Sequence, residues 1–341
     1  MSGAPDDARR IVVTGATGFV GGALVHRLHA TRPQARVLAL GRDPTRGAAL
    51  QQAGISFTAL DLTDAAGVAR ACKDADVVVH AAALSSPWGA PDAFHAANVV
   101  ASQNVANACV RADVQRLVHI STPGIYHDGK PHRGIREDDP LPARAANHYA
   151  ASKRAAEQRV LAACTQGNVP VLVLRPRAIF GPGDTSILPR IAEALRKGRL
   201  RRIGDGACMV DMSYIDNVLD AVLLAADAPA QLGGRAYNIS NGEPVRIWDV
   251  IDQLADALAV PRPAAAISRT RALLLARMLE AGYRMFAPRR EPPLMRYSVD
   301  LLSIDMTLDI SRARAELGYQ PRVPMHEALA RTFAGLARDG R

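Results

Sequence analysis

The sequence is poor in cysteine, in aromatic residues and in long apolar runs. Its four cysteines are far apart and form no C-x-x-C pair, a spacing that argues against a zinc module or a disulfide framework and fits a reducing cytoplasm. No metal site is expected. The most apolar run, near residues 77–84, is interrupted by His80 and is far shorter than the roughly 20 residues of a membrane-spanning helix. The first ten residues hold no apolar stretch, so no secretory signal is expected.

Positive charge is present in excess but is unevenly spread. The 42 Lys and Arg exceed the 33 Asp and Glu, for a formal net charge of +9. Residues 175–202 hold eight basic and two acidic residues, and residues 269–296 hold seven Arg and two Glu. Because the rest of the chain is slightly acidic, a general polyanion-binding surface is not indicated, and no nucleic-acid partner is expected. The two basic stretches are suited to attract an anionic substrate or to touch a membrane surface.

Short β-branched runs alternate with longer alanine-rich segments through the first half of the chain. The runs are almost wholly apolar, as in strands that are buried on both faces of a parallel sheet. This alternation predicts an α/β fold, namely a doubly wound Rossmann sheet with a smaller C-terminal substrate lobe. Strands are predicted at residues 11–14, 36–40, 55–60, 77–80, 116–121 and 169–174, and helices at residues 19–30, 65–71, 93–111 and 148–164.

The pattern changes after Leu174, where the substrate lobe is predicted to begin. Residues 175–184 are rich in Pro and Gly and are predicted as a loop, and residues 261–308 are the least regular part. Further elements are predicted as helices at residues 187–197, 215–226 and 247–258, and as a strand at residues 236–240. The NADP(H)-binding domain is assigned to residues 1–174 and 211–240, and the substrate-binding lobe to residues 175–210 and 241–341.

A glycine-rich turn, T-G-x-x-G-x-x-G, lies between the first predicted strand and the first predicted helix. Gly15 permits a tight turn, Gly18 lets the backbone approach a pyrophosphate, and Gly21 lets the helix pack on the strand. The phosphates would then lie at a helix N-terminus, where free N–H groups favour negative charge. The candidate cofactor-binding residues of this turn are Gly15, Thr17, Gly18, Phe19, Val20 and Gly21.

The end of the second predicted strand indicates which dinucleotide is bound. NAD enzymes usually place an acidic residue there, to accept the ribose 2′-hydroxyl. Here Gly41 holds that position and Arg42 follows, and a guanidinium matches a 2′-phosphate. NADP(H) is therefore favoured, and NAD(H) stays possible because a shift of one residue would present Asp43. Further cofactor candidates are Asp61 and Leu62, after the third strand, and Ala81, Ala82 and Ala83, after the fourth.

Two motifs are suited to acid/base chemistry on a carbonyl group. Tyr149 and Lys153 are four residues apart in a predicted helix, so they share one face, and the ammonium can stabilise the phenolate. Tyr149 is then a candidate proton donor or acceptor. Ser121 and Thr122 end the fifth predicted strand, and a hydroxyl there can hydrogen-bond a substrate carbonyl oxygen.

Several motifs together resemble the extended short-chain dehydrogenase/reductase superfamily over nearly the whole chain: TGATGFVG, HAAA, NVVASQNV, STPGIY, YAASK, RPRAIFGPGD and YIDN. The resemblance implies that Tyr149 is the acid/base and that Lys153 is its pKa partner and a ribose ligand. It implies Thr122 as the third catalytic residue, with Ser121 as a second candidate. Among the cofactor candidates it adds Asn98, which could instead only pack or cap, and Pro176. Members often dimerise through two helices that correspond to residues 93–111 and 148–164, so a homodimer is expected.

Two positions depart from the pattern of the sugar-nucleotide enzymes in this superfamily and indicate a different branch of it. Sugar-nucleotide epimerases and dehydratases usually carry an Asn where Ala178 stands and an Arg where Val210 stands. Losing an amide and a guanidinium removes the natural partners of a diphosphate. The chain also resembles the 3β-hydroxysteroid dehydrogenase and 2-alkyl-3-oxoalkanoate reductase branch, which handles hydrophobic 3-hydroxy and 3-oxo compounds.

The expected function is therefore the NADP(H)-dependent reduction, or the reverse oxidation, of a small hydrophobic and anionic 3-oxo compound, such as a β-keto acid or a sterol-like ketone. Two alternatives are a nucleotide-sugar epimerase or dehydratase and a non-catalytic NADP-binding protein. Residues 264–290 combine apolar side chains with six Arg. This segment has three interpretations: a lid over the substrate, a helix on a membrane surface, or a plain packing helix.

Overall fold

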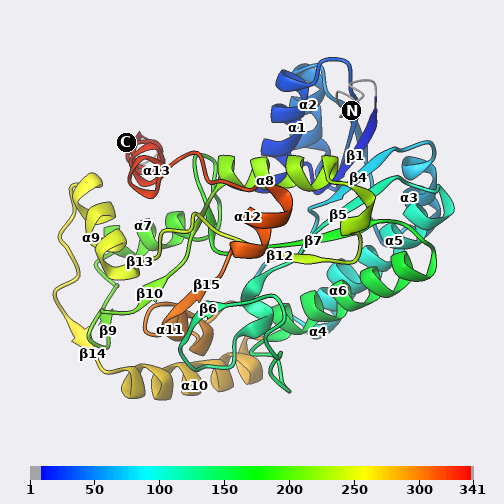
Figure 1. Ribbon diagram of the computed structural model, residues 1–341. Helices are drawn as coiled ribbons and strands as arrows, with labels where there is room; N and C mark the ends of the chain where they lie inside the picture. Colours follow the sequence, from blue (N-terminus) through cyan, green and yellow to red (C-terminus); the bar gives the residue numbers. More distant parts are fainter. Residues whose placement is uncertain (1–8, 339–341) are drawn as a thin grey trace.

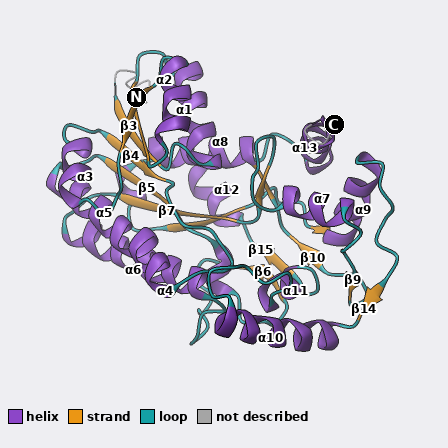
Figure 2. Ribbon diagram, turned by 180° about the vertical axis from the view of Figure 1, so that it is seen from behind, coloured by secondary structure: helices purple, strands orange, loops and turns teal. Residues whose placement is uncertain are grey.

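The computed structural model describes residues 9–338, so most of the N-terminal segment inspected for a signal lies outside it. A seven-stranded parallel sheet forms its centre, in the order β12-β7-β5-β4-β1-β2-β3 (Figures 1 and 2). Its strands are β1 (Arg10–Thr14), β2 (Arg36–Gly41), β3 (Ser56–Ala59), β4 (Val77–His80), β5 (Arg116–Ile120), β7 (Val171–Pro176) and β12 (Ala236–Ile239). The strand order reverses between β1 and β4, and ligands bind beyond the carboxyl ends of the strands at such a point.

Helices cover both faces of this sheet, and each face has its own apolar core. Val13 packs in one core with α1 (Phe19–Thr31) and α8 (Ile215–Asp227). Its neighbour Val12 packs in the other core with α3 (Ala65–Cys72), α5 (Ala101–Arg111) and α6 (His148–Gln166). This alternation is the one that a pleated strand imposes. The predicted doubly wound Rossmann fold is confirmed.

The second half of the chain, together with residues 132–135 from the first half, forms a smaller group of elements beside the carboxyl ends of β5 and β7 (Figure 1). A four-stranded sheet has the order β13-β10-β15-β6, and two strand pairs, β11-β8 and β14-β9, complete it. The strands are β6 (His132–Ile135), β8 (Ile179–Phe180), β9 (Arg202–Ile203), β10 (Met209–Val210), β11 (Ser213–Tyr214), β13 (Val245–Arg246), β14 (Ala266–Ile267) and β15 (Met306–Leu308). The helices are α7 (Leu188–Arg196), α9 (Ile247–Ala257), α10 (Arg269–Phe286), α11 (Arg296–Leu301), α12 (Ser311–Leu317) and α13 (Met325–Arg338).

Several details differ from the sequence prediction. The chain forms an unpredicted helix α2 (Pro44–Gln52), whose first turn is capped by the Asp43 carboxylate. The helix predicted over residues 93–111 is α4 (Pro91–Phe94), a π-helical turn (His95–Val100) and α5. The segment 261–308, described from the sequence as the least regular part, contains the 18-residue helix α10, within the range for which the sequence suggests a helix. Short 3-10 turns at Pro123–Tyr126 and Ala230–Leu232 complete the elements.

Within residues 9–338, no helix is long and apolar enough to span a bilayer. In the same range, no three His, Cys, Asp or Glu side chains are grouped as a metal ion would require.

Candidate active site

The glycine-rich turn lies against the end of β4, and its geometry requires glycine. Gly15 has φ +74°, and a Cβ atom there would lie 2.7 Å from the Ala82 nitrogen. A Cβ on Gly21 would lie 2.3 Å from the Gly15 carbonyl oxygen. Gly18 is the N-cap of α1 and supplies no side-chain cap, so the first N–H groups of α1 are free to bind phosphate. The turn therefore has the form of a pyrophosphate cradle.

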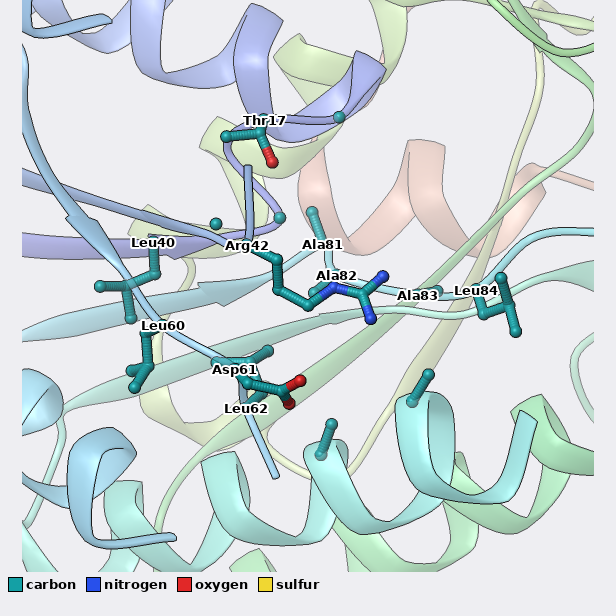
Figure 3. Close-up of a pocket in the computed structure, with 15 residues that line it drawn as sticks. Thr17, Leu40, Arg42, Leu60, Asp61, Leu62, Ala81, Ala82, Ala83 and Leu84 are labelled. Carbon is teal, nitrogen blue, oxygen red and sulfur yellow. The ribbon is translucent and has the colours of Figure 1, made fainter. Parts of the chain in front are cut away.

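A cleft opens between this turn and the ends of β2, β3 and β4 (Figure 3). Of the predicted cofactor residues, those that line it are Gly15, Thr17, Gly18, Arg42, Asp61, Leu62, Ala81, Ala82 and Ala83. Phe19, Val20, Gly21, Asn98, Pro176 and the Tyr149/Lys153 pair are not among its lining residues. The remaining lining residues, which were not among the predicted candidates, are Leu40, Gly41, Leu60, Leu84, Ala97 and Ala101. Small and apolar walls beside a phosphate cradle fit the adenosine half of a dinucleotide.

The structure gives different environments to Arg42 and Asp43, the two candidates for contact with the ribose. The Asp43 carboxylate accepts from the backbone N–H groups of Thr45 and Arg46, at 2.9 and 3.1 Å, and so serves as the cap of α2. Arg42 is exposed, and its guanidinium extends across the cleft beside Ala82 (Figure 3). Arg46, which sequence reasoning missed, donates to the Thr17 carbonyl oxygen at 3.0 Å. Arg42 thus lines the cleft at the end of β2, and Arg46 lies beside it at the Thr17 carbonyl.

The candidate catalytic pair is positioned by α6. Asn147 caps this helix by accepting from the Ala150 N–H, which sets Tyr149 in the first turn and Lys153 one turn later. Burial raises the pKa of the Tyr149 phenol, the nearby Tyr297 phenol adds to this effect, and hydrogen bonding with Thr122 lowers the pKa. The phenol is therefore protonated at neutral pH, as a proton donor must be.

Lys153 is buried one helical turn after Tyr149, and its ammonium donates to the Ile120 carbonyl oxygen at 2.6 Å. Burial lowers the pKa of Lys153 to about 8, while the charge of Glu157 opposes this change. The lysine therefore stays largely protonated at neutral pH, as a cation that is to stabilise a phenolate must be.

The structure distinguishes Thr122 from Ser121. The Ser121 hydroxyl donates to the Glu157 carboxylate at 2.6 Å and is buried against α6. The Thr122 hydroxyl accepts from the Gly124 N–H at 3.1 Å and lies beside Tyr149. Thr122 is consequently the better-placed partner for a substrate carbonyl oxygen.

The Asn98 amide is already occupied by the protein. It accepts from the Leu84 N–H at 2.7 Å and donates to the Leu84 carbonyl at 3.1 Å and to the Ser152 hydroxyl at 2.8 Å. These bonds tie the loop after β4 to α6. They fit the packing alternative for Asn98 better than direct cofactor binding.

A buried network of hydrogen bonds around His80 connects the strands beneath the glycine-rich turn. His80 is hydrogen-bonded by its two ring nitrogens to the hydroxyls of Thr14 and Ser102, at 2.7 and 2.8 Å. Burial, with the charge of Lys153, lowers the pKa of His80 to about 3, so the ring is neutral. The Thr14 hydroxyl also accepts from the Ala82 N–H at 3.3 Å. The ends of β1 and β4 are thereby held together beneath the glycine-rich turn.

Comparisons with known proteins bear on the family and the fold of this chain. The family model described as "NAD dependent epimerase/dehydratase family" matches residues 11–240. A 2-alkyl-3-oxoalkanoate reductase of Stenotrophomonas maltophilia is 39% identical, covering 96% of this chain and 99% of that protein. The 3beta-hydroxysteroid-dehydrogenase/decarboxylase isoform 1 of Arabidopsis thaliana is 32% identical, covering 95% of this chain and 79% of that protein. The solved structure of DesIV, a dTDP-glucose 4,6-dehydratase from Streptomyces venezuelae with NAD bound, superposes with a TM-score of 0.77 at 24% identity, covering 97% of this chain and 98% of that one.

Proposed function

The chain belongs to the NAD dependent epimerase/dehydratase family, and from that premise we propose that it is an NADP(H)-dependent reductase of hydrophobic 3-oxo acids. The observation that carries the proposal is the grouping of Tyr149 and Thr122 at the carboxyl edge of the sheet, beside a dinucleotide cleft. Relatives named as a 2-alkyl-3-oxoalkanoate reductase and as 3beta-hydroxysteroid dehydrogenases support an oxidoreductase with this substrate class.

The side chains divide the proposed chemistry between them. Bound NADPH would supply the hydride that reduces the ketone carbon. Thr122 orients the carbonyl oxygen toward Tyr149, whose hydroxyl gives that oxygen a proton. Lys153 stabilises the phenolate left on Tyr149. The glycine-rich turn holds the pyrophosphate, and Arg42 with Arg46 pairs with the 2′-phosphate.

The direct test of this proposal is a substrate screen with purified protein. NADPH and NADH are each offered with 3-oxo acids of increasing alkyl length, 3-oxosteroids and nucleoside diphosphate sugars, and absorbance at the nicotinamide band is followed. Oxidation of NADPH with the long 3-oxo acids supports the proposal. Clear NADPH binding with no turnover of any ketone would instead support the non-catalytic alternative.

A nucleotide-sugar epimerase is the principal enzymatic alternative, because solved structures with this fold bind nucleotide sugars. Two features of the site disfavour it. Ala178 and Val210 stand where such enzymes usually have Asn and Arg, and Val210 is buried in β10. Tight binding of a nucleoside diphosphate sugar, measured by calorimetry, would favour the epimerase.

Removing the two arginines at the ribose end should change the cofactor preference. Replacing Arg42 and Arg46 with Ala is expected to weaken NADPH binding by at least about 100-fold, since each of the two charge-assisted bonds contributes roughly 1.5–3 kcal/mol and about 1.4 kcal/mol is tenfold. NADH binding should change little, because NADH lacks the 2′-phosphate. Nucleotide fluorescence titration measures both affinities. Arg36→Ala, an exposed arginine at the opposite end of β2, is the matched control. Equal weakening of NADPH and NADH binding would contradict the assignment.

We also propose that α10 contacts an anionic membrane surface. Its large exposed side chains form an outward stripe at helical spacing, with Leu274 60%, Met278 65% and Met285 74% exposed. Exposed Arg271, Arg277 and Arg284 flank the stripe. The buried side is formed by Ala272, Ala276 and Glu280. An apolar stripe bordered by Arg suits the interface of an acidic bilayer. Because these large side chains point outward, this arrangement favours the membrane over the lid interpretation.

Vesicle flotation tests this surface. The protein should bind vesicles of phosphatidylcholine mixed with phosphatidylglycerol and bind pure phosphatidylcholine much less. Met278→Ser with Met285→Ser, or Arg271→Glu with Arg277→Glu, should reduce binding at least fivefold, since each buried methylene contributes about 0.8 kcal/mol and each Arg about 1 kcal/mol. Arg70→Glu, on α3 and highly exposed, is the charge control. The wild type could instead bind no vesicles, while the substitutions in α10 convert a dimer into a monomer on light scattering. That result would show that a second copy of the chain covers the stripe.

A homodimer through α5 and α6 is also proposed. The two helices lie side by side on one face of the sheet (Figure 1). Ala151, Ala155 and Ala162 lie outward on α6 at helical spacing, and small residues of this kind let two helices approach closely. Such an interface would leave α10 free, because α10 lies in the other half of the molecule (Figure 1).

A further inference from the structure

Arg177 lies one residue beyond β7, at the edge of the sheet that carries the catalytic candidates. β5 and β7 are paired in parallel with Ile120 opposite Leu174, so two residues further along Thr122 comes level with Pro176. The Arg177 backbone is fixed in place, because its N–H donates to the Ile239 carbonyl and the Ser213 hydroxyl, each at 3.1 Å. The Arg177 backbone therefore lies one residue beyond the level of Thr122, at the same edge of the sheet.

The guanidinium of Arg177 is buried without an ionic partner. The residue is only 6% exposed, yet no carboxylate within residues 9–338 lies within 4.0 Å of it, and its Nε atom has no hydrogen-bond partner. Arg175, two residues earlier, is also buried but pairs with Glu157. A buried cation is costly unless it is paired. Arg177 therefore lacks a partner of the kind that Arg175 has.

Asp211, whose charge acts on Arg177, does not pair with it. The Asp211 carboxylate is buried and accepts from the Leu308 N–H at 2.7 Å, while its second oxygen has no partner. Burial raises the pKa of Asp211, and the charge of Arg177 opposes the change. The two groups thus influence each other without forming an ion pair.

Tyr297 connects Arg177 to the catalytic residues. It is the second residue of α11, and its hydroxyl lies 3.8 Å from the position that a Cβ on Gly124 would take, beside Thr122. Burial raises the pKa of the Tyr297 phenol, and the positive charge of Arg177 lowers it. The same phenol acts on Tyr149. One site therefore contains the proton donor, the Thr122 hydroxyl and an unpaired buried guanidinium.

We propose that Arg177 binds the carboxylate of the 3-oxo acid substrate and so determines its specificity for acids over neutral ketones. This inference rests on the proposed function. A guanidinium binds a carboxylate through two parallel hydrogen bonds, which fixes the orientation of a carboxylate two carbons from the ketone. The carboxylate of the bound acid serves as the counter-ion of Arg177. The ketone oxygen of the acid is thereby directed toward Tyr149 and Thr122.

Substrate pairs that differ in the carboxylate test this role. Wild type, Arg177→Met and Arg177→Lys are assayed with a long-chain 3-oxo acid and with the neutral ketone that lacks its carboxyl group. Arg177→Met should raise KM for the acid at least 30-fold and change kcat/KM for the ketone less than threefold, and Arg177→Lys should fall between. Arg116→Met is the matched control, because Arg116 is equally buried but lies at the opposite end of β5.

Calorimetric binding of the 3-hydroxy acid, in the presence of NADP⁺, gives a readout that does not depend on turnover. Loss of this binding in Arg177→Met, with retained NADP⁺ binding, supports the inference. Equal loss for acid and ketone, or unchanged acid binding, overturns it. If Arg177→Met fails to bind NADP⁺, Arg177→Lys decides between these outcomes. A wild type that reduces none of the 3-oxo compounds contradicts the proposed function, whereas a wild type that reduces acid and ketone equally contradicts only the role of Arg177.

Discussion

Replacing Tyr149 with Phe is expected to lower kcat about 10³-fold and to leave the affinity for NADPH nearly unchanged. The Phe ring retains the packing of the phenol but has no proton to give to the carbonyl oxygen, and general acid catalysis contributes roughly 10²–10⁴-fold. The adenosine cleft does not include Tyr149 among its lining residues, so dinucleotide binding should persist. Steady-state kinetics with the best ketone and fluorescence titration with NADPH measure the two quantities.

A matched control separates chemistry from folding in this experiment. Tyr283→Phe removes the same hydroxyl from α10, far from α6 in the chain, and should leave kcat within twofold of wild type. If Tyr149→Phe turned over ketone at more than a fifth of the wild-type rate, another group would have to donate the proton. Thr122→Val should then be the more damaging variant. Comparison of the two variants therefore assigns the roles of proton donor and orienting hydroxyl.

Site residues that belong to short motifs, with fixed spacing along the chain, could be predicted from the sequence. The glycine-rich turn and the Tyr149/Lys153 pair are defined within eight residues each, and the adjacent strand and helix show where they lie. Their placement at one edge of a parallel sheet follows from the order of strands and helices. For this reason the fold, the glycine-rich turn and the Tyr149/Lys153 pair could be predicted from the sequence.

Contacts between distant segments could not be predicted in this way. Tyr297 is brought beside Tyr149 from α11, across 148 residues of chain, and no periodicity indicates that approach. The different environments of Arg175 and Arg177 depend on Glu157, which belongs to another element. Likewise, the choice between Ser121 and Thr122 depends on which hydroxyl the Glu157 carboxylate occupies. Sequence spacing alone treats these neighbours as equivalent.

Glu157 itself should be among the most important residues for stability. It follows Lys153 by one turn of α6 and is only 5% exposed. Its carboxylate accepts from the Ser121 hydroxyl at 2.6 Å and forms a buried ion pair with Arg175. Through these bonds the catalytic helix is attached to β5 and β7. Removing the carboxylate leaves a buried guanidinium without its counter-ion, which is the costly way to break such a pair.

Glu157→Ala is therefore expected to lower the free energy of unfolding by about 3–5 kcal/mol, measured by urea denaturation. Asp256→Ala breaks an exposed ion pair with Arg262 and should have little measurable effect, because solvent already screens that pair. The double variant Glu157→Leu with Arg175→Met removes both charges and should recover much of the lost stability, since apolar pairs often replace buried ion pairs without net cost. If the single and double variants were equally unstable, the hydrogen bond to Ser121, and not the unpaired charge of Arg175, would account for the contribution of Glu157.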